Sequence, residues 1–435
     1  MQQIATASLR GLAARQFSSL RTYNYRVYFG GQLVSLIGTW MQTTGQAWLV
    51  LKLSSSPLAL GTVTTLQFLP ITLFTLFGGV FADRLPKRRI LIITQALALL
   101  QAFTLGLLVV TGQVELWHVY VLAFFLGVIN AFDGPVRQAF VVELVGRDQL
   151  TNAVALNSSV FNTARILGPA VGGVLIAIVG MSATFFVNSV SYVGVLAAYL
   201  SMRPDEFHAV DFRRGNGNVL AQVAEGVRYS LRTPAVLFLF ILLAFIGTFG
   251  YNFTVIIPLV AEFVLGVGPG KFGLLTSAMG VGSLGTALVI AGKGRLSTRV
   301  LLLASSAFVV LLGGLALSPW FLLSAALLVV LGAAGVAFST TINTTLQLTV
   351  PDHLRGRVMS IFFLLFAGST PFGGYLTGLL AEELGVPVAM SILAAICGAG
   401  VLVALAYKNA HAADIEAAVP VQPVPAQINL PGHSR

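Results

Sequence analysis

The segment GGVFADRLPKRR, from Gly78 to Arg89, joins the end of a long apolar run to the densest charge in the chain. Its two glycines allow close helix contact, and four cations follow its single carboxylate, Asp83. A short basic turn between apolar runs is typical of a cytoplasmic hairpin between membrane spans, because Lys and Arg hold a loop on that side. A plain topogenic loop would explain the cations. A carboxylate at the end of a span is costly unless it is paired or caps a helix N-terminus, so Asp83 beside Arg84 indicates a specific partner.

The composition of the 435-residue chain supports a membrane protein. Hydrophobic residues make up 56% of the chain, charged residues 9%, and the mean hydropathy is +0.89, whereas soluble domains carry about 25% charge. The net charge of +10 lies between apolar runs and not on one polar face, so we expect no nucleic acid. With one cysteine, Cys397, and five scattered histidines, we expect no disulfide, metal or other cofactor.

Twelve apolar stretches are long enough to cross a bilayer, since a span needs about 20 residues. The first six cover approximately 26–50, 58–82, 89–111, 115–135, 152–179 and 182–201, and the second six 234–262, 271–292, 299–317, 320–345, 357–381 and 386–407. Residues 202–233 form a polar connector between them. Degenerate copies of motifs recur in the second half; for example, Gly292 to Arg299 corresponds to Gly79 to Arg89. We therefore predict an all-α membrane protein with twelve transmembrane helices in two six-helix pseudo-repeats, 26–201 and 234–408.

The distribution of cations predicts the orientation. Lys52 and Lys271 are the only cations in the expected outer segments; apart from Arg165, all the other Lys and Arg residues fall in cytoplasmic segments if both termini are inside. We expect residues 1–25 to form an amphipathic lead-in on the cytoplasmic membrane surface, because Phe17, Leu20 and two tyrosines lie among arginines. The proline-rich residues 409–435 are expected to form a disordered cytoplasmic tail.

The segment Gly79 to Arg89 resembles the loop between helices two and three of the major facilitator superfamily, with the pattern G-x-x-x-D-R-x-x-R-R. Pro86 and Lys87 stand where that family more often has Gly and Arg. In that family the acid locks the two halves of the protein in one conformation. The resemblance implies this role for Asp83, within a conformational latch made of Gly79, Asp83, Arg84, Arg88 and Arg89.

Residues 164–173, ARILGPAVGG, are similar to the helix-five motif of the drug/proton antiporter branch of that superfamily, with Ala164 in place of its first glycine. Pro169 frees a backbone carbonyl, and the glycines permit close helix contact, although ordinary packing would explain them equally well. Arg165 lies near the expected midplane, where a charge costs several kcal/mol. It therefore predicts a cavity, in which it binds an anionic or polar substrate or controls access; a structural pair with a carbonyl or Asn is the alternative. The motif comprises Arg165, Gly168, Pro169, Gly172 and Gly173.

Polar side chains near mid-depth outline an expected substrate path. Gln42 and Gln46 share one helix face at a spacing of four residues. Buried amides also commonly hold helices together, so each of these residues has that simpler interpretation. The predicted path consists of Gln42, Gln46, Gln67, Asn130, Asn162, Arg165, Tyr251, Asn252 and Asn343.

The acidic residues lie at or beyond the ends of the expected spans, which leaves no carboxylate at mid-depth. The fourth span, Trp117 to Asn130, also lacks the arginine that many drug/proton antiporters carry there. Asp133 and Glu262 are the candidate proton sites, with Asp83 and protonation of the substrate as alternatives. Asp133 ranks first because Arg137 follows one turn later, although an exposed ion pair at the membrane interface would explain both residues equally.

Three further stretches, Gly31 to Trp40, Ser56 to Gly61 and Phe132 to Gln138, resemble the bacterial exporters similar to the enterobactin exporter. This resemblance extends from Tyr25 to about Lys408. It implies a secondary transporter in the cell inner membrane, which exports a drug-like compound or a siderophore by alternating access. We expect a monomer driven by protons, and no enzyme, since no catalytic pair is visible. A solute importer of the same fold, or a non-transporting membrane scaffold or sensor, is the alternative.

Overall fold

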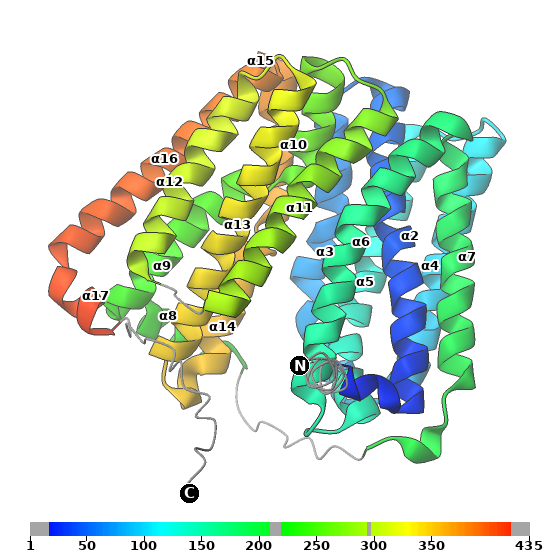
Figure 1. The fold of residues 1–435 in the computed structure, drawn as a ribbon, viewed down its shortest axis with the longest axis horizontal. Coiled ribbons are helices and arrows are strands. Elements are labelled where there is room, and N and C mark those ends of the chain that lie inside the picture. Colours follow the sequence, from blue (N-terminus) through cyan, green and yellow to red (C-terminus); the bar gives the residue numbers. More distant parts are fainter. Residues whose placement is uncertain (1–16, 209–218, 294–296, 419–435) are drawn as a thin grey trace, which may run out of the picture.

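The computed structural model describes residues 17–208, 219–293 and 297–418, with side chains outside 76–84, 219–223, 291–293 and 416–418. All regular structure in these ranges is helical. The first half comprises α2 (Tyr23–Ser54), α3 (Pro57–Arg84), α4 (Lys87–Val110), α5 (Leu116–Val145), α6 (Leu150–Ile178) and α7 (Met181–Ser201). These six helices stand side by side as one bundle (Figure 1).

The second half repeats this arrangement with more interruptions. Its helices are α9 (Pro234–Phe245), α10 (Phe253–Leu259), α11 (Pro269–Lys293), α12 (Thr298–Ala316), α13 (Phe321–Thr349), α14 (Asp352–Phe366), α15 (Thr370–Leu384) and α16 (Val386–Ala410). The wide π-helical turns η3 (Ile246–Gly250) and η4 (Val260–Val264) flank α10 and make one irregular crossing from Pro234 to Val264. A short break between α14 and α15 interrupts another crossing.

The long helices agree with the predicted spans. In the described part of the chain, eleven helical runs are long and apolar enough to cross a membrane. The 32-residue α2 is a further long helix, although it is not among the eleven. It packs against α6 and α7 and buries the amides of Gln32, Gln42 and Gln46. These polar residues lower the mean hydropathy of α2. Their side chains lie inside the bundle and do not face lipid.

Three sequence-based expectations about boundaries are wrong. The fourth span does not end at residue 135, because α5 passes through Pro135 and continues to Val145; one proline removes a single backbone donor, which a packed bundle tolerates. Tyr25 is fully buried in α2, so it does not lie on a membrane surface. The tail is not disordered throughout, because α17 (Ala412–Ala418) follows α16 and buries Ile415 completely. Residues 1–16 of the lead-in and 419–435 of the tail lie outside the described residues.

The polar connector also contains a helix. The amphipathic α8 (Val219–Arg232) packs against α14 and α9 of the second half. Glu225 of α8 forms an ion pair with Arg357 of α14. The connector therefore attaches to the second half before the first long helix of that half begins.

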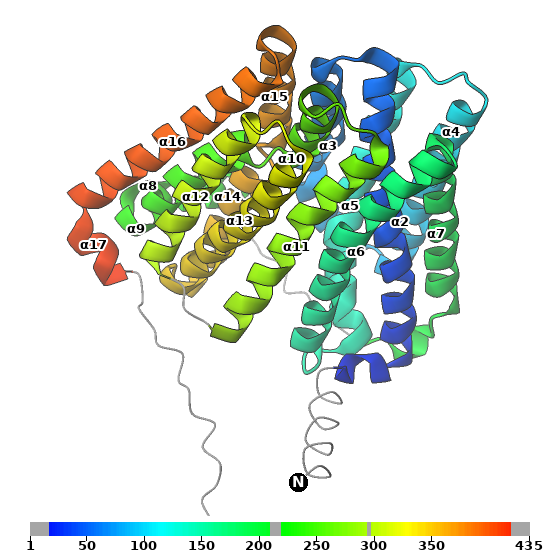
Figure 2. The same cartoon turned by 45° about the horizontal axis from the view of Figure 1, so that its top comes forward.

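The halves meet along two helix pairs, α6 with α11 and α3 with α15. We call the end of the bundle that carries Lys87, Arg88 and Arg89 the basic end, and the other the opposite end. Glycines bring the halves together at the opposite end: a methyl group on Gly61 would lie 2.7 Å from the carbonyl oxygen of Gly374. The two halves converge at this end and spread apart toward the basic end (Figures 1 and 2).

Polar contacts across the interface also close the opposite end. Lys52 Nζ lies 3.3 Å from Glu262 Oε1. Glu382 Oε2 at the end of α15 accepts hydrogen bonds from the Ser56 hydroxyl at 2.7 Å and the Leu58 amide at 3.2 Å. A carboxylate of one half thus caps the first turn of a helix in the other, where the helix dipole favours negative charge.

Candidate functional site

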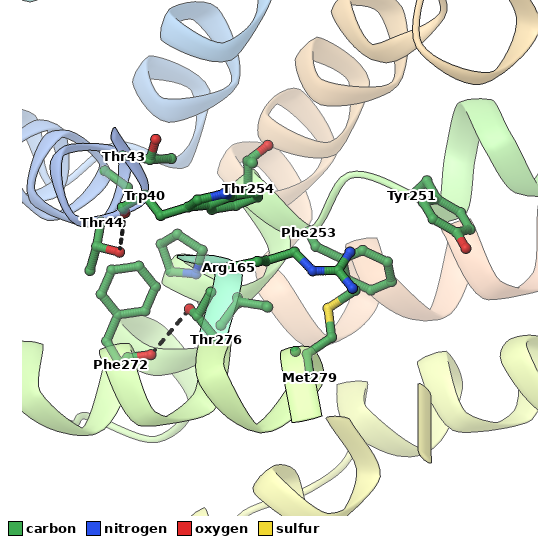
Figure 3. Close-up of a pocket in the computed structure, with 14 residues that line it drawn as sticks. Trp40, Thr43, Thr44, Arg165, Tyr251, Phe253, Thr254, Phe272, Thr276 and Met279 are labelled. Atoms are coloured by element: carbon green, nitrogen blue, oxygen red, sulfur yellow. Dashed lines mark hydrogen bonds between the residues drawn. The ribbon is translucent and has the colours of Figure 1, made fainter. Parts of the chain in front are cut away.

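A cavity of about 190 Å³ lies between the two halves, and we call it the central cavity. Side chains from α2, α6, the crossing around α10, and α11 line it, so both halves contribute (Figure 3). The lining residues are Trp40, Thr43, Thr44, Ala47, Arg165, Tyr251, Phe253, Thr254, Ile257, Pro258, Phe272, Thr276, Met279 and Gly280.

Arg165 is the one charged residue among those that line the central cavity. Its side chain extends from α6 between Phe253 and Met279 toward the ring of Tyr251 (Figure 3). One guanidinium nitrogen donates to Asn162 Oδ1 at 3.2 Å, while Nε is buried without a hydrogen-bond partner. The cation is therefore only partly satisfied by the described protein groups, and it faces a space into which a ligand can bring an acceptor.

Aromatic rings fix the wall opposite Arg165. Tyr251, at the break between η3 and α10, stacks on Phe308 with ring centroids 5.4 Å apart and an interplanar angle of 7°. Its ring also meets those of Phe253, Phe338 and Phe366. The cavity thus combines a rigid aromatic wall with one cation, which suits an amphipathic ligand carrying a negative or hydrogen-bond-accepting group.

The glycines of residues 164–173 face two different neighbours. Gly168 and Gly172 contact α2, where added methyl groups would lie 2.5 Å from Trp40 Cβ and 3.0 Å from Met41 Cγ. Gly173 faces α11 of the other half, and its methyl group would lie 2.5 Å from the carbonyl oxygen of Pro269. The helix therefore uses one set of small residues to join its own half and another to join its partner.

Pro169 supplies a third contact in this region. Because proline has no amide hydrogen, the carbonyl of Arg165 four residues earlier loses its helical partner. That carbonyl faces Gly280 of α11, and the carbonyl of Pro169 itself packs against Gly273. Backbone carbonyls of α6 beside the central cavity thus form part of the contact between the halves.

A second cavity, of about 130 Å³, lies within the first half, and we call it the polar cavity. Amides hydrogen-bond across its walls: Gln42 receives a bond from Asn188 at 2.6 Å and donates to Gln101 at 3.0 Å, while Gln46 donates to Gln67 at 3.0 Å. Its lining consists of Ser35, Leu36, Thr39, Gln42, Thr43, Gln46, Gln67, Gln95, Ala98, Leu126, Ile129, Asn130, Arg137, Asn188 and Tyr192.

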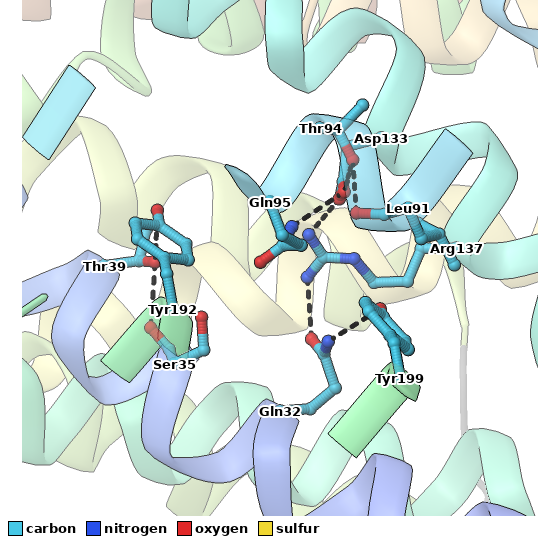
Figure 4. Close-up of polar contacts among 10 residues, drawn as sticks. All are labelled: Gln32, Ser35, Thr39, Leu91, Thr94, Gln95, Asp133, Arg137, Tyr192 and Tyr199. Atoms are coloured by element: carbon cyan, nitrogen blue, oxygen red, sulfur yellow. Dashed lines mark hydrogen bonds and ion pairs between the residues drawn. The ribbon is translucent and has the colours of Figure 1, made fainter. Parts of the chain in front are cut away.

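A buried ion pair lies beside the polar cavity, toward the basic end. Asp133 is only 1% exposed, forms an ion pair with Arg137 one turn along α5, and accepts hydrogen bonds from Thr94 at 2.7 Å and Gln95 at 2.8 Å. Arg137 also donates to Gln32 at 2.8 Å (Figure 4). The expectations that Asp133 lies at a helix end and that the pair is exposed are therefore wrong; the helix continues through both residues.

The basic turn ties the first half together. Lys87 is 6% exposed and pairs with Glu143 of α5 at 2.7 Å. Arg88 donates to the carbonyl oxygens of Tyr199 at 2.7 Å and Leu200 at 3.0 Å, at the end of α7. Arg89 is exposed. Of the remaining predicted latch residues, Gly79, Asp83 and Arg84 belong to the last turns of α3, and their side chains lie outside the description.

The predicted substrate path divides between the two cavities. Arg165 and Tyr251 line the central cavity, with Asn162 bonded to Arg165, whereas Gln42, Gln46, Gln67 and Asn130 line the polar cavity.

The other two predicted path residues bond within their own segments. Asn252 donates to the carbonyl oxygen of Thr248, and Asn343 accepts from Gln347. Of the candidate proton sites, Asp133 is buried near the basic end, while Glu262 belongs to the ion pair at the opposite end.

Sequence reasoning missed most of the apolar wall of the central cavity. Trp40, Phe253, Phe272 and Met279 lie within apolar stretches, where they look like ordinary lipid-facing or core residues. Gln32, Gln95, Gln101 and Asn188 of the polar networks were also missed, although amides within an apolar span are a signal that could have found them.

A family model described as transmembrane secretion effector matches residues 14–430. The chain is 30% identical over 348 residues to the multidrug efflux pump Tap of Mycolicibacterium fortuitum, a match that covers 78% of this chain and 84% of the pump. It is 25% identical over 378 residues to the staphyloferrin A transporter of Staphylococcus aureus, covering 85% and 92%.

Solved structures confirm the predicted all-α fold in two six-helix halves. A POT family transporter in complex with 5-aminolevulinic acid is similar with a TM-score of 0.72 and 12% identity, over 89% of this chain and 96% of that one. A bacterial homologue of the lysosomal transporter Spinster gives 0.67 and 15%, over 93% and 99%.

Proposed function

We propose, since the chain belongs to the transmembrane secretion effector family of major facilitator transporters, that it exports an amphipathic small molecule, a drug-like compound or a siderophore. Two similar proteins are named for multidrug efflux and for staphyloferrin A, which supports this range of substrates. The observation that carries the proposal is Arg165, a lone cation in a largely apolar cavity between the halves. It would bind a negative or hydrogen-bond-accepting group while the aromatic wall holds the apolar part of the molecule.

The basic end faces the cytoplasm in this proposal, because positively charged loops are retained there. Both termini then lie in the cytoplasm, and the membrane is the cell inner membrane. Closure of the opposite end by Glu262 and Glu382 would leave the central cavity accessible from the cytoplasm, as loading of an exporter requires. Residues 26–201 and 234–408 would move as two bodies about the linker 202–233, with the latch of Gly79, Asp83, Arg84, Arg88 and Arg89 acting on the outward-open state.

Protons drive the export, and Asp133 is the first site that we propose for them. Its carboxylate is buried and bonded to Thr94, Gln95 and Arg137, so its protonation would release Arg137, which also bonds to Gln32 of α2. Glu262 is the second candidate, since its protonation would remove the charge that faces Lys52. In exchange by alternating access, one substrate molecule moves outward while protons move inward.

Transport into inside-out membrane vesicles tests the proposal. With a proton gradient imposed, fluorescent drugs and catechol siderophores are screened for uptake, which in such vesicles corresponds to export. For a transported compound, Arg165→Ala should raise the apparent KM by about 10- to 150-fold, because a hydrogen bond to a charged group contributes about 1.5–3 kcal/mol. Arg165→Lys should retain part of the activity.

The matched control is Arg147→Ala, which removes an exposed cation in the turn between α5 and α6. It should transport normally. Native uptake by Arg165→Ala would remove the proposed anchor. Uptake only into right-side-out vesicles would instead establish the alternative of a solute importer.

Two further measurements test the other parts of the proposal. Transport at native rates after a protonophore collapses the gradient would contradict proton coupling. A mass measurement in lipid nanodiscs checks the proposed monomer.

A further inference from the structure

The polar cavity is lined in a way that requires water. Its walls carry six side-chain amides beside hydroxyls and a guanidinium, whereas no amide side chain is among the residues that line the central cavity. Two buried donors have no partner among the described residues: Nε of Arg137, which lines the cavity, and Nε2 of Gln101, which accepts a bond from the lining residue Gln42. Buried polar groups that lack protein partners are usually bonded to internal water. At about 130 Å³ the polar cavity has room for several molecules.

The polar cavity connects two features already described. At the basic end its wall includes Gln95 and Arg137, both of which bond to Asp133. Toward the middle of the bundle its wall includes Thr43, and Thr43 also lines the central cavity. Among the residues that line the two cavities it is the only one common to both.

The chemistry of Thr43 suits a portal. Its hydroxyl donates to the carbonyl oxygen of Thr39 on its own helix at 2.9 Å. The donor is therefore occupied, while the oxygen can still accept hydrogen bonds. Because Thr43 lines both cavities, its oxygen is the group on which waters from the two sides could meet.

We propose that the polar cavity is a hydrated chamber that conducts protons between Asp133 and the central cavity, with Thr43 as the portal. This inference rests on the proposed function, because it assigns the route to the proposed proton site. Substrate and proton would then share one entrance but occupy separate cavities, and the exchange would be coordinated at Thr43.

The proton balance is simple. A hydronium ion in the central cavity passes one proton to a chain of waters, and each water accepts one proton and releases another. The last water gives its proton to the Asp133 carboxylate, which becomes a neutral carboxylic acid. This acid can still accept the hydrogen bonds from Thr94 and Gln95. In the reverse direction Asp133 releases the same proton. Thr43 undergoes no net change, since it only orients the waters.

Protonation of Asp133 can be followed directly in the full-length protein in lipid nanodiscs. After a rapid drop in pH, the carboxylic acid band is recorded by time-resolved infrared spectroscopy, and its absence in Asp133→Asn assigns it. Thr43→Val should slow the appearance of the band by about fivefold without changing its final size, because loss of one hydrogen-bonding group costs about 1 kcal/mol. Thr43→Ser, which keeps the hydroxyl, should behave as the native protein does.

A matched control is Thr341→Val. Thr341 of α13 bonds to its own helix in the same way, through the carbonyl oxygen of Ala337 at 2.6 Å, but lines neither cavity. Its variant should show native kinetics. Native kinetics in Thr43→Val would overturn the portal while leaving Asp133 as the proton site. If no Asp133 band appears in the native protein at any pH, the proposed proton site fails, and the route to it fails with it.

Hydration of the chamber has an independent measurement that needs neither substrate nor protonation. Radiolytic hydroxyl-radical footprinting labels buried side chains that touch internal water. Tyr192 lines the polar cavity and is 5% exposed, so it should be labelled, whereas Phe338, which lines neither cavity and is fully buried, should not. Ala98→Leu should fill the chamber, abolish labelling of Tyr192 and slow protonation of Asp133. Equal, weak labelling of Tyr192 and Phe338 would show a dry cavity and overturn the proposal.

Discussion

Replacement of Gly173 by alanine should separate the two halves at the opposite end. The new methyl group would lie 2.5 Å from the carbonyl oxygen of Pro269 and 3.1 Å from Gly273 Cα. Both neighbours are backbone atoms, so neither can rotate away, and the contact between α6 and α11 must widen. Overpacking of this kind costs about 1–3 kcal/mol, which corresponds to a shift of about 5- to 150-fold in the equilibrium between the closed and open conformations.

Spin-label distances measure this shift. Labels attached after Gln113→Cys and Glu383→Cys, both exposed positions at the opposite end, report the separation of the halves; the native Cys397 is fully buried and should not react. Gly173→Ala should move the distance distribution to longer values. The control Gly194→Ala adds a methyl group to α7 where no atom lies within 4 Å, and it should leave the distribution unchanged. An unchanged distribution in Gly173→Ala would refute the argument that this contact holds the opposite end closed.

Three further substitutions test other contacts. Glu382→Gln removes the charge that caps α3 through the Leu58 amide, so the same label pair should show about a two- to fivefold shift toward separation, equivalent to about 0.3–1 kcal/mol; a native distribution would contradict this. Asp133→Asn leaves the Arg137 charge without its carboxylate and should destabilise the protein by about 3–5 kcal/mol, which thermal unfolding in nanodiscs measures, with Arg137→Met on the same background restoring part of the loss. An unchanged melting temperature in Asp133→Asn would argue that the pair is not a buried, stabilising contact. Asp83→Asn should abolish export in inside-out vesicles while the protein still reaches the membrane, and normal transport by it would remove Asp83 from the proposed latch.

The number and order of the spans could be predicted from sequence because the bilayer imposes one strong rule, about 20 apolar residues for each crossing. The ends of the helices could not. Asp133 and Pro135 look like the end of a span, yet Thr94, Gln95 and Arg137 satisfy the carboxylate inside the bundle. Local signals for a helix end were overridden by partners distant in the sequence.

The site was predictable to a similar degree. Arg165 stood out because a charge at mid-depth is costly, and it does line a cavity between the halves. Trp40 and Phe253 could not be assigned, since an aromatic residue in an apolar span carries no signal of what it faces. The amides of Gln42 and Gln46 were expected on the same path as Arg165, but helix spacing alone does not show which cavity a face lines.

The π-helical turns on either side of α10 add extra residues to the crossing from Pro234 to Val264. Each wide turn holds one residue more than an α-helical turn, and an α-helix advances about 100° for each residue. If η3 tightened into an α-helical turn, the chain beyond it would rotate by about that angle and carry Tyr251 off the wall that faces Arg165. If η4 tightened, Glu262 would turn relative to Lys52. The same crossing could therefore rotate at two places, at η3 beside the central cavity and at η4 beside the closed opposite end.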